Sequence, residues 1–265
     1  MIKDPQSYIV RKESWNDYHL LSLESPKIAL EGQPGQFIMV RITEHFHPLL
    51  RRPFSIHSID GRNVEIFFLN SGLGTSLLSQ KKTNDTLDIL GPLGKGFNLN
   101  DHFKEKDVAL IGGGRGIAPL YFLAQRLSSL GASIRIFYGG KTLADLPLKD
   151  KLKKAGFDTF FSTDDGSFGF KGLITDFFKA ELEIFTPIHI FSCGPEPMMA
   201  KIAKIAQKKK IPAEFSLESV MGCGFGACWS CVRKIRRGNK EEWVKICEEG
   251  PVFSADEIIW KEGDK

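Results

Sequence analysis

Four of the five cysteines fall in one C-terminal block, and their spacing constrains the chain more than any other feature. Cys223, Cys228 and Cys231 follow the pattern C-x4-C-x2-C, and Cys247 comes after fifteen further residues. This is the spacing of plant-type [2Fe–2S] ligands, in which three thiolates share one loop and a fourth arrives separately. Glycines within 222–226 let the loop bend and bring backbone N–H groups near sulfur. The block therefore predicts a [2Fe–2S] cluster.

Two other uses of four cysteines remain open from the sequence. A structural zinc site usually shows two C-x2-C pairs, whereas this block has one such pair. Two disulfides would need an oxidising compartment, and the N-terminal residues 1–6 lack the apolar core of a signal peptide. We therefore expect a cytoplasmic protein with reduced thiols.

The composition is that of an ordinary globular protein with room for two domains. The chain has 265 residues, of which 42% are hydrophobic and 26% are charged. The net charge of +4 is small, and Lys and Arg are scattered along the chain, which argues against a nucleic-acid partner. No apolar run reaches the length that spans a bilayer, so we expect no membrane segment.

Residues 1–100 are predicted to form a small antiparallel β-barrel. Short β-rich runs are separated by turn-rich joints such as 31–35, and one helix is expected at Thr75–Gln80. The predicted strands are Ser7–Val10, Tyr18–Leu23, Gln36–Ile42, Pro53–Ile59, Val64–Leu69 and Thr86–Leu90.

Residues 101–217 change to a strand–helix alternation, which predicts a parallel sheet covered by helices on both faces. The predicted strands are Val108–Ile111, Ser133–Tyr138, Thr159–Ser162, Ile188–Phe191 and Ala213–Leu217. Helices are expected near Pro119–Leu130, Leu146–Ala155, Leu173–Ala180 and Glu196–Lys208. Residues 218–265 are expected to form a third, small module that carries the cysteines, with a hairpin tip at Arg236–Asn239.

Two stretches of the predicted barrel are suited to phosphate. Arg51–Ser55 begins a strand, and a guanidinium there can bind a diphosphate through two hydrogen bonds. These arginines are equally read as surface residues before an edge-strand proline. Asn70–Thr75 leads from a strand into a helix, where free N–H groups and glycines favour an anion. Together the two stretches suggest a dinucleotide.

A second nucleotide site is expected at the carboxyl edge of the parallel sheet, where ligands bind in open α/β folds. The glycine-rich loop 112–116 follows the first strand and opens the first helix, although its spacing is not G-x-G-x-x-G. Later strands end in Tyr138–Gly140, Thr163–Gly166 and Cys193–Met199. Cys193 lies beside a nicotinamide or is a small buried residue. The expected site residues are Gly112, Gly113, Gly114, Gly116, Asp164, Asp165, Gly166, Cys193 and Gly194.

Taken together, these stretches resemble the ferredoxin-reductase superfamily, in which a flavin-binding barrel precedes a nicotinamide-binding α/β domain. Within it the chain is similar to the electron-transfer subunits of NAD-linked dihydroorotate dehydrogenase. The similarity covers nearly the whole chain and is most specific in the cysteine block. It lies in Arg51–Ser55, Gly74–Thr75, Gly112–Gly114, Thr163–Gly169, Cys223–Cys231 and Cys247–Phe253.

The resemblance implies three cofactors. FAD would be held by Arg52, Pro53, Phe54, Ser55, Gly74 and Thr75, with the strand Phe67, Phe68 and Leu69 lining its ring. The [2Fe–2S] cluster would be held by Cys223, Cys228, Cys231 and Cys247, and NAD would bind across the glycine-rich loop. Arg115 and Phe54 depart from the residues expected in the family, and an arginine in the glycine loop leaves the nucleotide fit open.

The implied activity is an electron relay without a catalytic acid or base on this chain. Flavin exchanges electrons in pairs with nicotinamide and singly with the cluster. The resemblance implies a partner subunit that holds FMN and oxidises dihydroorotate in pyrimidine biosynthesis, in a heterotetramer with two copies of each chain. Two alternatives remain: an NAD(P)H-linked subunit of another complex, such as a hydrogenase, and a zinc-stapled binding protein.

Overall fold

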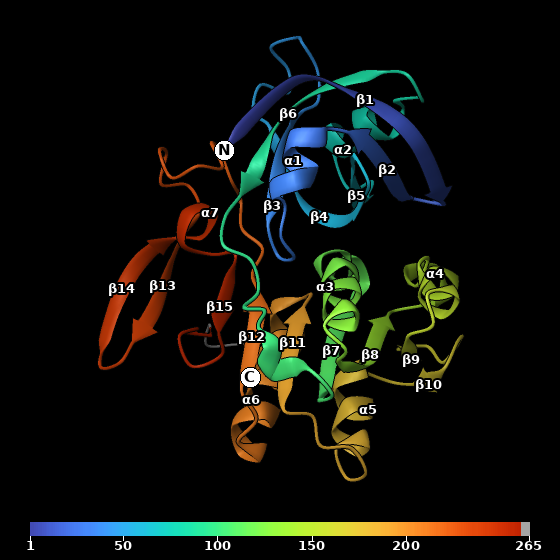
Figure 1. Cartoon of the computed structure of the whole chain (residues 1–265), viewed down its shortest axis with the longest axis vertical. Coiled ribbons are helices and arrows are strands. Elements are labelled where there is room, and N and C mark those ends of the chain that lie inside the picture. The colour runs from blue at the N-terminus through green and yellow to red at the C-terminus, as the bar shows by residue number, and fades with distance from the viewer. Residues whose placement is uncertain (261–265) are drawn as a thin grey trace. The chain divides into compact units, whose positions relative to one another are not determined.

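The computed structural model describes residues 1–260 (Figure 1), which divide into two compact units. The first, here called the barrel unit, comprises Met1–Gly96, Glu218–Arg233 and Trp243–Pro251. The second, here called the sheet unit, comprises Phe97–Leu217, Lys234–Glu242 and the residues from Val252 onward. All four cysteines of the C-terminal block lie in the barrel unit. The division into 1–100, 101–217 and 218–265 stays a prediction.

The barrel predicted for the first hundred residues is confirmed. Six antiparallel strands close in the order β1-β2-β5-β4-β3-β6. They are β1 (Ile2–Trp15), β2 (Tyr18–Glu24), β3 (Phe37–Arg41), β4 (Arg52–Asp60), β5 (Asn63–Leu69) and β6 (Thr86–Leu93). Alternation along β6 shows why: Leu87, Ile89, Gly91 and Leu93 are buried, whereas each residue between two of them is more exposed.

Two short helices belong to the barrel unit. Helix α2 (Leu73–Ser79) lies within two residues of the expected helix at Thr75–Gln80. Helix α1 (Pro26–Glu31) was not predicted. Its six residues are too few to display a helical period, and its start is marked only by Pro26 in the first turn. It forms because Ile28 and Ala29 are buried.

The sheet unit contains the predicted parallel sheet, in the order β10-β9-β8-β7-β11-β12-β15. Its parallel strands are β7 (Asp107–Gly113), β8 (Ser133–Gly140), β9 (Asp158–Thr163), β10 (Phe170–Lys171), β11 (His189–Cys193) and β12 (Ala213–Ser216). Strand β15 (Val252–Ser254) pairs antiparallel with β12. Neither β10 nor β15 was predicted, because strands of two or three residues carry no period of their own.

Helices cover both faces of this sheet. The helices are α3 (Ile117–Ser129), α4 (Lys149–Lys154), α5 (Ile174–Glu181) and α6 (Glu196–Lys209). The unit also contains the 3₁₀ turns η1 (Asp101–Phe103), η2 (Gly114–Gly116) and η3 (Leu143–Asp145). Adjacent residues of β8 show the two faces. The Phe137 ring packs 5.0 Å from that of Phe178 in α5, whereas the Tyr138 hydroxyl donates to the carbonyl of Asp145.

The C-terminal residues form a hairpin and a short helix. Strands β13 (Val232–Arg237) and β14 (Lys240–Lys245) pair with each other, and Gly238 at the turn has φ +60°. The expected tip at 236–239 is therefore confirmed. Helix α7 (Ile246–Glu249) follows directly. None of the helices in residues 1–260 combines the length and the apolar character that a bilayer crossing requires.

A buried titratable pair lies in the sheet unit. The His189 ring stacks on Phe191 with centroids 4.4 Å apart, and its Nε2 lies 3.8 Å from a carboxylate oxygen of Glu214. Burial, and then the neighbouring His102, lowers the pKa of His189 to about 4. Burial also raises the pKa of Glu214, against an N–H donated by Asn98. Each side chain is therefore held away from its charged form.

The lowered pKa of His189 predicts acid sensitivity of the fold. Between pH 6.5 and about pH 4, the unfolded histidine takes up a proton that the folded one refuses. Stability from this group is complete above pH 6.5 and is lost as pH falls toward 4, by about 3 kcal/mol at most. Glu214 has the opposite effect. Because its pKa is raised in the folded protein, the stability that it contributes is lost as pH rises.

The variant His189→Phe keeps an aromatic ring against Phe191 and removes the titration. We expect its thermal unfolding temperature to fall less than that of the wild type between pH 6.5 and pH 4. Circular dichroism melts at half-unit intervals measure the difference. Parallel curves for the two proteins would contradict the prediction.

Candidate functional site

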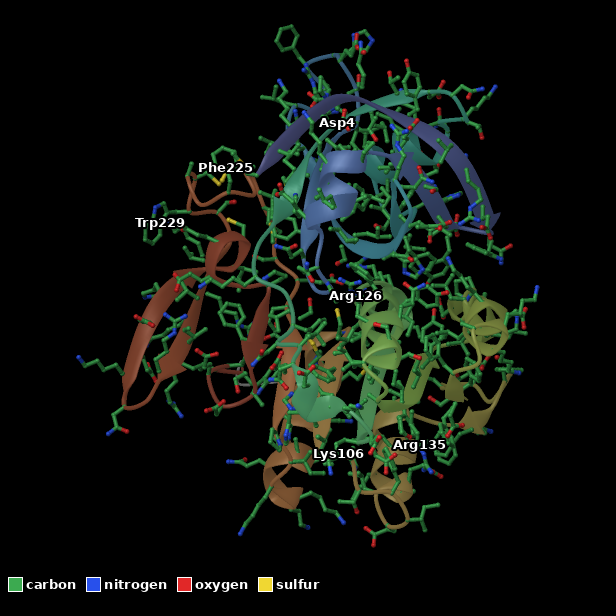
Figure 2. The ribbon with its side chains drawn as sticks, viewed as in Figure 1. Asp4, Lys106, Arg126, Arg135, Phe225 and Trp229 are labelled. Carbon is green, nitrogen blue, oxygen red and sulfur yellow. The ribbon has the colours of Figure 1, made fainter. Side chains whose placement is uncertain are left out.

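The cysteines of the C-terminal block come from two segments of the barrel unit. Cys223, Cys228 and Cys231 lie on the loop that precedes β13, and Cys247 lies in α7. Cys231 and Cys247 are buried, whereas Cys228 is exposed. None of the five cysteines, all of which lie within residues 1–260, forms a disulfide bond. Figure 2 shows the loop with its labelled side chains Phe225 and Trp229, which are 48% and 57% exposed.

Backbone N–H groups point at the sulfur atoms, as the glycines in the loop predict. The N–H of Gly226 donates to Sγ of Cys247 at 3.1 Å. The N–H of Cys223 donates to Sγ of Cys228 at 3.3 Å, and the N–H of Cys247 donates to Sγ of Cys231 at 3.4 Å. Such bonds stabilise negative charge on sulfur and tune the potential of a bound cluster.

The thiols differ in how readily they ionise. Hydrogen bonds from Ser230, and then from Cys223, lower the pKa of Cys228 to about 6. Burial, and then the neighbouring Cys231, raises the pKa of Cys247 to about 12. Several thiolates cannot share this space unless a cation compensates them, and a metal that binds here would deprotonate the coordinating thiols.

This donor set fits a binuclear iron–sulfur cluster. In residues 1–260, no three His, Cys, Asp or Glu side chains converge as ligands of a single metal ion. Backbone-to-sulfur hydrogen bonds link the cysteines in two pairs, Cys223 with Cys228 and Cys231 with Cys247. Each iron of a [2Fe–2S] cluster takes two protein thiolates and shares the bridging sulfides, so two pairs match its requirement.

A close approach fixes the cysteine loop to the barrel. Gly224 has φ +84°, and a Cβ there would lie only 2.4 Å from Cγ of Met39 in β3. A side chain at position 224 would therefore force the loop away from the strand. Near the other cysteine segment, the N–H of Lys95 donates to the carbonyl of Gly250 at 2.6 Å.

The two arginines of the predicted phosphate stretch have different surroundings. The Arg51 guanidinium pairs with β6, donating to the carbonyl and the carboxylate of Asp88 at 2.7 and 2.6 Å. Arg52 lies against the second phosphate-type stretch, because a Cβ on Gly74 would lie 3.1 Å from its Nε. The structure therefore brings Arg52 and Gly74 together, as a shared phosphate site requires, and engages Arg51 in the barrel.

The other residues expected at the flavin lie on β4, β5 and α2. Pro53, Phe54 and Ser55 follow Arg52 along β4, where Ser55 is opposite Phe37 of β3. Thr75 holds the turn before α2, since its Oγ1 accepts from the N–H groups of Ser71 and Gly72.

The predicted ring-lining strand lies beside this stretch. The Phe68 ring is 5.5 Å from that of Phe54, so β5 and β4 join there. Phe67 faces the other way, stacked on Tyr18 at 5.6 Å. Leu69, which lies opposite Tyr18 in the register, ends the strand.

In the sheet unit, register brings the predicted nucleotide residues to one edge. Gly112 at the end of β7 lies opposite both Cys193 of β11 and Tyr138 of β8. Gly140 lies opposite Thr163 at the end of β9. Successive strands run from β7 toward β9 on one side, and β11 and β12 lie on the other. This reversal of strand order marks the position where open α/β sheets bind ligands.

Glycines at this edge let two loops pack without side chains between them. A Cβ on Gly116 would lie 2.2 Å from the carbonyl oxygen of Cys193 and 2.6 Å from Cα of Gly194. A Cβ on Gly113 would lie 2.8 Å from Sδ of Met198. Gly114 has φ +53° and nothing within 4 Å of a Cβ position, so its partly exposed backbone is accessible to a ligand. Arg115 is exposed beside it.

The loop after β9 is held by its own side chains. Asp165 accepts from the N–H and the hydroxyl of Ser167 at 2.9 and 2.6 Å, which lowers the pKa of its carboxyl. Gly166 has φ +79°, as the turn requires. Asp164 is exposed, and its N–H donates to the carbonyl of Gly140. This loop therefore presents Asp164 at the edge and uses Asp165 to shape the turn.

Three residues of the cysteine site were missed from the sequence. Ser230 accepts from the N–H of Gly222 at 2.8 Å and lies 3.3 Å from Sγ of Cys228. Met39 meets the loop at Gly224, and Lys245 contacts it from β14. Ser230 and Lys245 lie within two residues of a cysteine ligand, which was an available signal. Nothing in the sequence marks Met39.

Comparisons with known proteins agree with the nucleotide-type region of the sheet unit and with the cysteine block. The sequence model for the iron-sulfur cluster binding domain of dihydroorotate dehydrogenase B matches residues 218–259. The model for the oxidoreductase NAD-binding domain matches residues 110–204.

Whole-chain relatives give the same result. The electron transfer subunit of dihydroorotate dehydrogenase B (NAD(+)) from Shouchella clausii is 37% identical, over 95% of this chain and 96% of the relative. The subunit of the same name from Geobacillus kaustophilus is 39% identical, over 90% and 91%.

Solved structures share the fold. The NADH-dependent reduced ferredoxin-NADP oxidoreductase has a TM-score of 0.83 and 28% identity, over 97% of this chain and 91% of that chain. A ferredoxin NADP+ reductase from Neisseria gonorrhoeae has a TM-score of 0.64, over 78% and 91%. At 19% identity, the latter likeness concerns the fold alone.

The fold and the site define an oxidoreductase of the ferredoxin-reductase class to which an iron–sulfur segment has been added. The relatives that match nearly the full length of the chain define a narrower family within that class. The chain belongs to the family of electron-transfer subunits of NAD(+)-dependent dihydroorotate dehydrogenase B.

The packing of Gly116 predicts a cost for any side chain there. In Gly116→Ala the new methyl group would meet the carbonyl of Cys193, so the loops after β7 and β11 must separate. We expect a loss of about 1–3 kcal/mol, typical of overpacking. Chemical unfolding of the purified protein measures it. Gly72→Ala is the control, because nothing lies within 4 Å of its Cβ. Equal stability of the two variants would contradict the prediction.

Proposed function

We propose that the chain passes electrons between NAD and a dihydroorotate dehydrogenase catalytic subunit, through FAD and a [2Fe–2S] cluster that it binds. The observation that carries the proposal is the cysteine block, whose paired thiols and N–H donors lie in the same folded unit as the Arg52–Gly74 contact. A two-electron carrier site and a one-electron carrier site on one unit are what such a relay needs. The names of the curated relatives support the same function.

The flavin site is proposed on the barrel unit. Arg52 would bind the diphosphate. Because Gly74 has no side chain, the Arg52 guanidinium can lie close to the turn before α2. Pro53, Phe54, Ser55 and Thr75 would complete the site, with Phe67, Phe68 and Leu69 on the neighbouring strand. Flavin, when bound, supplies exchange of electrons in pairs or singly. The chain positions it and excludes water.

The cluster site is proposed on Cys223, Cys228, Cys231 and Cys247. Backbone N–H groups of Cys223, Gly226 and Cys247 would stabilise the charge on the sulfur atoms. The cluster, when bound, supplies one-electron transfer.

The nicotinamide site is proposed at the carboxyl edge of the sheet unit. The backbone of Gly112, Gly113, Gly114 and Gly116 would approach the pyrophosphate of NAD. Asp164, Asp165 and Gly166 would border the site after β9. Cys193 and Gly194 would lie beside the nicotinamide, where the loop after β11 packs on Gly116. No acid or base on the chain is needed, since a hydride moves without a proton.

The partner is proposed to be an FMN-containing catalytic subunit that oxidises dihydroorotate, in a heterotetramer with two copies of each chain. Exposed apolar side chains lie in the cysteine loop or directly beside it in the sequence: Val220, Phe225, Trp229 and Val232. Apolar surface of this extent beside a redox site favours an interface. Short distances to the partner favour electron transfer, so this surface is the expected docking site.

A second function has support from one observation. The solved NADH-dependent reduced ferredoxin-NADP oxidoreductase matches this fold over 97% of the chain at a TM-score of 0.83. A chain with this architecture therefore suits another electron-transfer complex as well.

The partner that copurifies distinguishes the two functions. Affinity purification of the chain from its own cells should retain a flavoprotein that oxidises dihydroorotate with NAD. About one FAD and two irons per chain are expected by cofactor and metal analysis. Zinc without iron after anaerobic preparation would refute the relay, and a ferredoxin-linked partner would favour the second function.

Removal of Arg52 tests the flavin site. Arg52→Ala should weaken FAD binding by about 1.5–3 kcal/mol, because a charged hydrogen bond to phosphate is lost. FAD content after gel filtration measures retention. Arg51→Ala is the matched control, and it should lower barrel stability through the lost Asp88 pair. Unchanged FAD content in the Arg52 variant would show that the diphosphate binds elsewhere.

Removal of Trp229 tests the docking surface. Trp229→Ala should reduce electron flow to the catalytic subunit at least about tenfold, as expected for a buried interface tryptophan. NADH-driven reduction of a small dye, taken from FAD, should stay near normal. Phe46→Ala, in a barrel loop and 91% exposed, is the control. A parallel fall of both activities would show that Trp229 supports the fold instead.

A further inference from the structure

Lys245 joins the two segments that carry the cysteines. It ends β14, two residues before Cys247, and its ammonium donates to the carbonyl of Gly226 on the cysteine loop at 3.0 Å. The N–H of the same glycine donates to Sγ of Cys247 at 3.1 Å. Lys245 is therefore connected to a ligand sulfur through one residue of the opposite segment.

The ammonium has two further partners in the same place. Its Nζ lies 2.5 Å from Oε2 of Glu248 and 5.0 Å from the centre of the Trp229 ring. A carbonyl, a carboxylate and an aromatic face are all favourable neighbours for a cation. The Lys245 side chain is only 19% exposed. This arrangement differs from a surface ion pair, which holds one partner and is worth little.

The loop that Lys245 contacts has a backbone that needs support. Gly226 has φ +91°, and a Cβ there would lie 2.7 Å from the Glu248 carboxylate. Trp229 has φ +57°, a left-handed conformation that side chains other than glycine rarely adopt. Such conformations persist only where the surroundings fix them. Lys245 contacts both residues and is the side chain placed to fix them.

We propose that Lys245 positions the cysteine loop against Cys247 and, by its charge, raises the reduction potential of the cluster. This inference rests on the proposed function, because it requires a [2Fe–2S] cluster on the four cysteines. Reduction adds one negative charge to the cluster, and a nearby fixed cation stabilises the reduced form. Net charge and hydrogen bonds to sulfur are among the factors that set such potentials. Lys245 is a positioning residue and not a ligand.

The test compares substitutions at 245 in the full chain, purified anaerobically. Lys245→Met removes the charge and the hydrogen bonds, whereas Lys245→Arg keeps both. Lys240→Met removes the same charge from the other end of β14, about 16 Å away at 3.3 Å per residue. Iron per chain and the midpoint potential from an EPR-monitored titration are the measurements.

We expect Lys245→Met to lower the midpoint potential, and Lys245→Arg and Lys240→Met to keep that of the wild type. An unchanged potential in Lys245→Met would overturn the electrostatic role. Loss of iron, with a normal potential in the clusters that remain, would also overturn the electrostatic role. Lys245 would then only position the loop.

Glu248→Gln provides a second measurement if Lys245→Met does not yield folded protein. It removes the carboxylate that partly neutralises the ammonium and leaves Lys245 in place, so the potential should rise. A potential that stays unchanged would count against the proposal. Absence of a [2Fe–2S] signal in the wild type would instead refute the proposed function, so the two failures are distinguishable.

Discussion

Repulsion between thiolates is the interaction that the two cysteine segments of the barrel unit must offset. Four sulfur atoms must approach one another, and burial raises the pKa of Cys247 to about 12. The backbone turns N–H groups toward sulfur, among them that of Gly226. The loop takes left-handed turns at Gly224 and Gly226, and Met39 and Glu248 leave no room for a side chain there. Both positions therefore require glycine.

The placement of the cysteines gives the two units different tasks. The Arg52–Gly74 contact and the paired thiols share the barrel unit, so both proposed electron carriers belong to one folded body. The sheet unit gathers the ends of β7, β8, β9 and β11 at one edge, which is the proposed nucleotide site. The residues proposed to bind the pyridine nucleotide and those proposed to bind the cluster therefore belong to different units.

Much of this architecture could be predicted from the sequence, because it depends on the hydrophobic period and on the spacing of glycines and cysteines. Alternation of apolar and polar residues identified the barrel strands, and the glycines after β7 marked the sheet edge. Three features were not readable. Helix α1 is too short to show a period, and β15 exists only because it pairs with β12. Adjacent arginines have the same chemistry, and only the fold shows that Arg51 serves Asp88 while Arg52 meets Gly74.

The barrel unit is assembled from three separate stretches of chain, the last of which ends at Pro251. The strands of residues 1–96 leave the ribosome first. Two of their contacts, Met39 with Gly224 and Lys95 with the carbonyl of Gly250, form only after the later stretches have been synthesised. Most of the sheet unit, Phe97–Leu217, is synthesised in between. The set of four cysteines is therefore complete only after residue 247 has been synthesised, and a chain truncated before Cys247 would expose three thiols to oxidation.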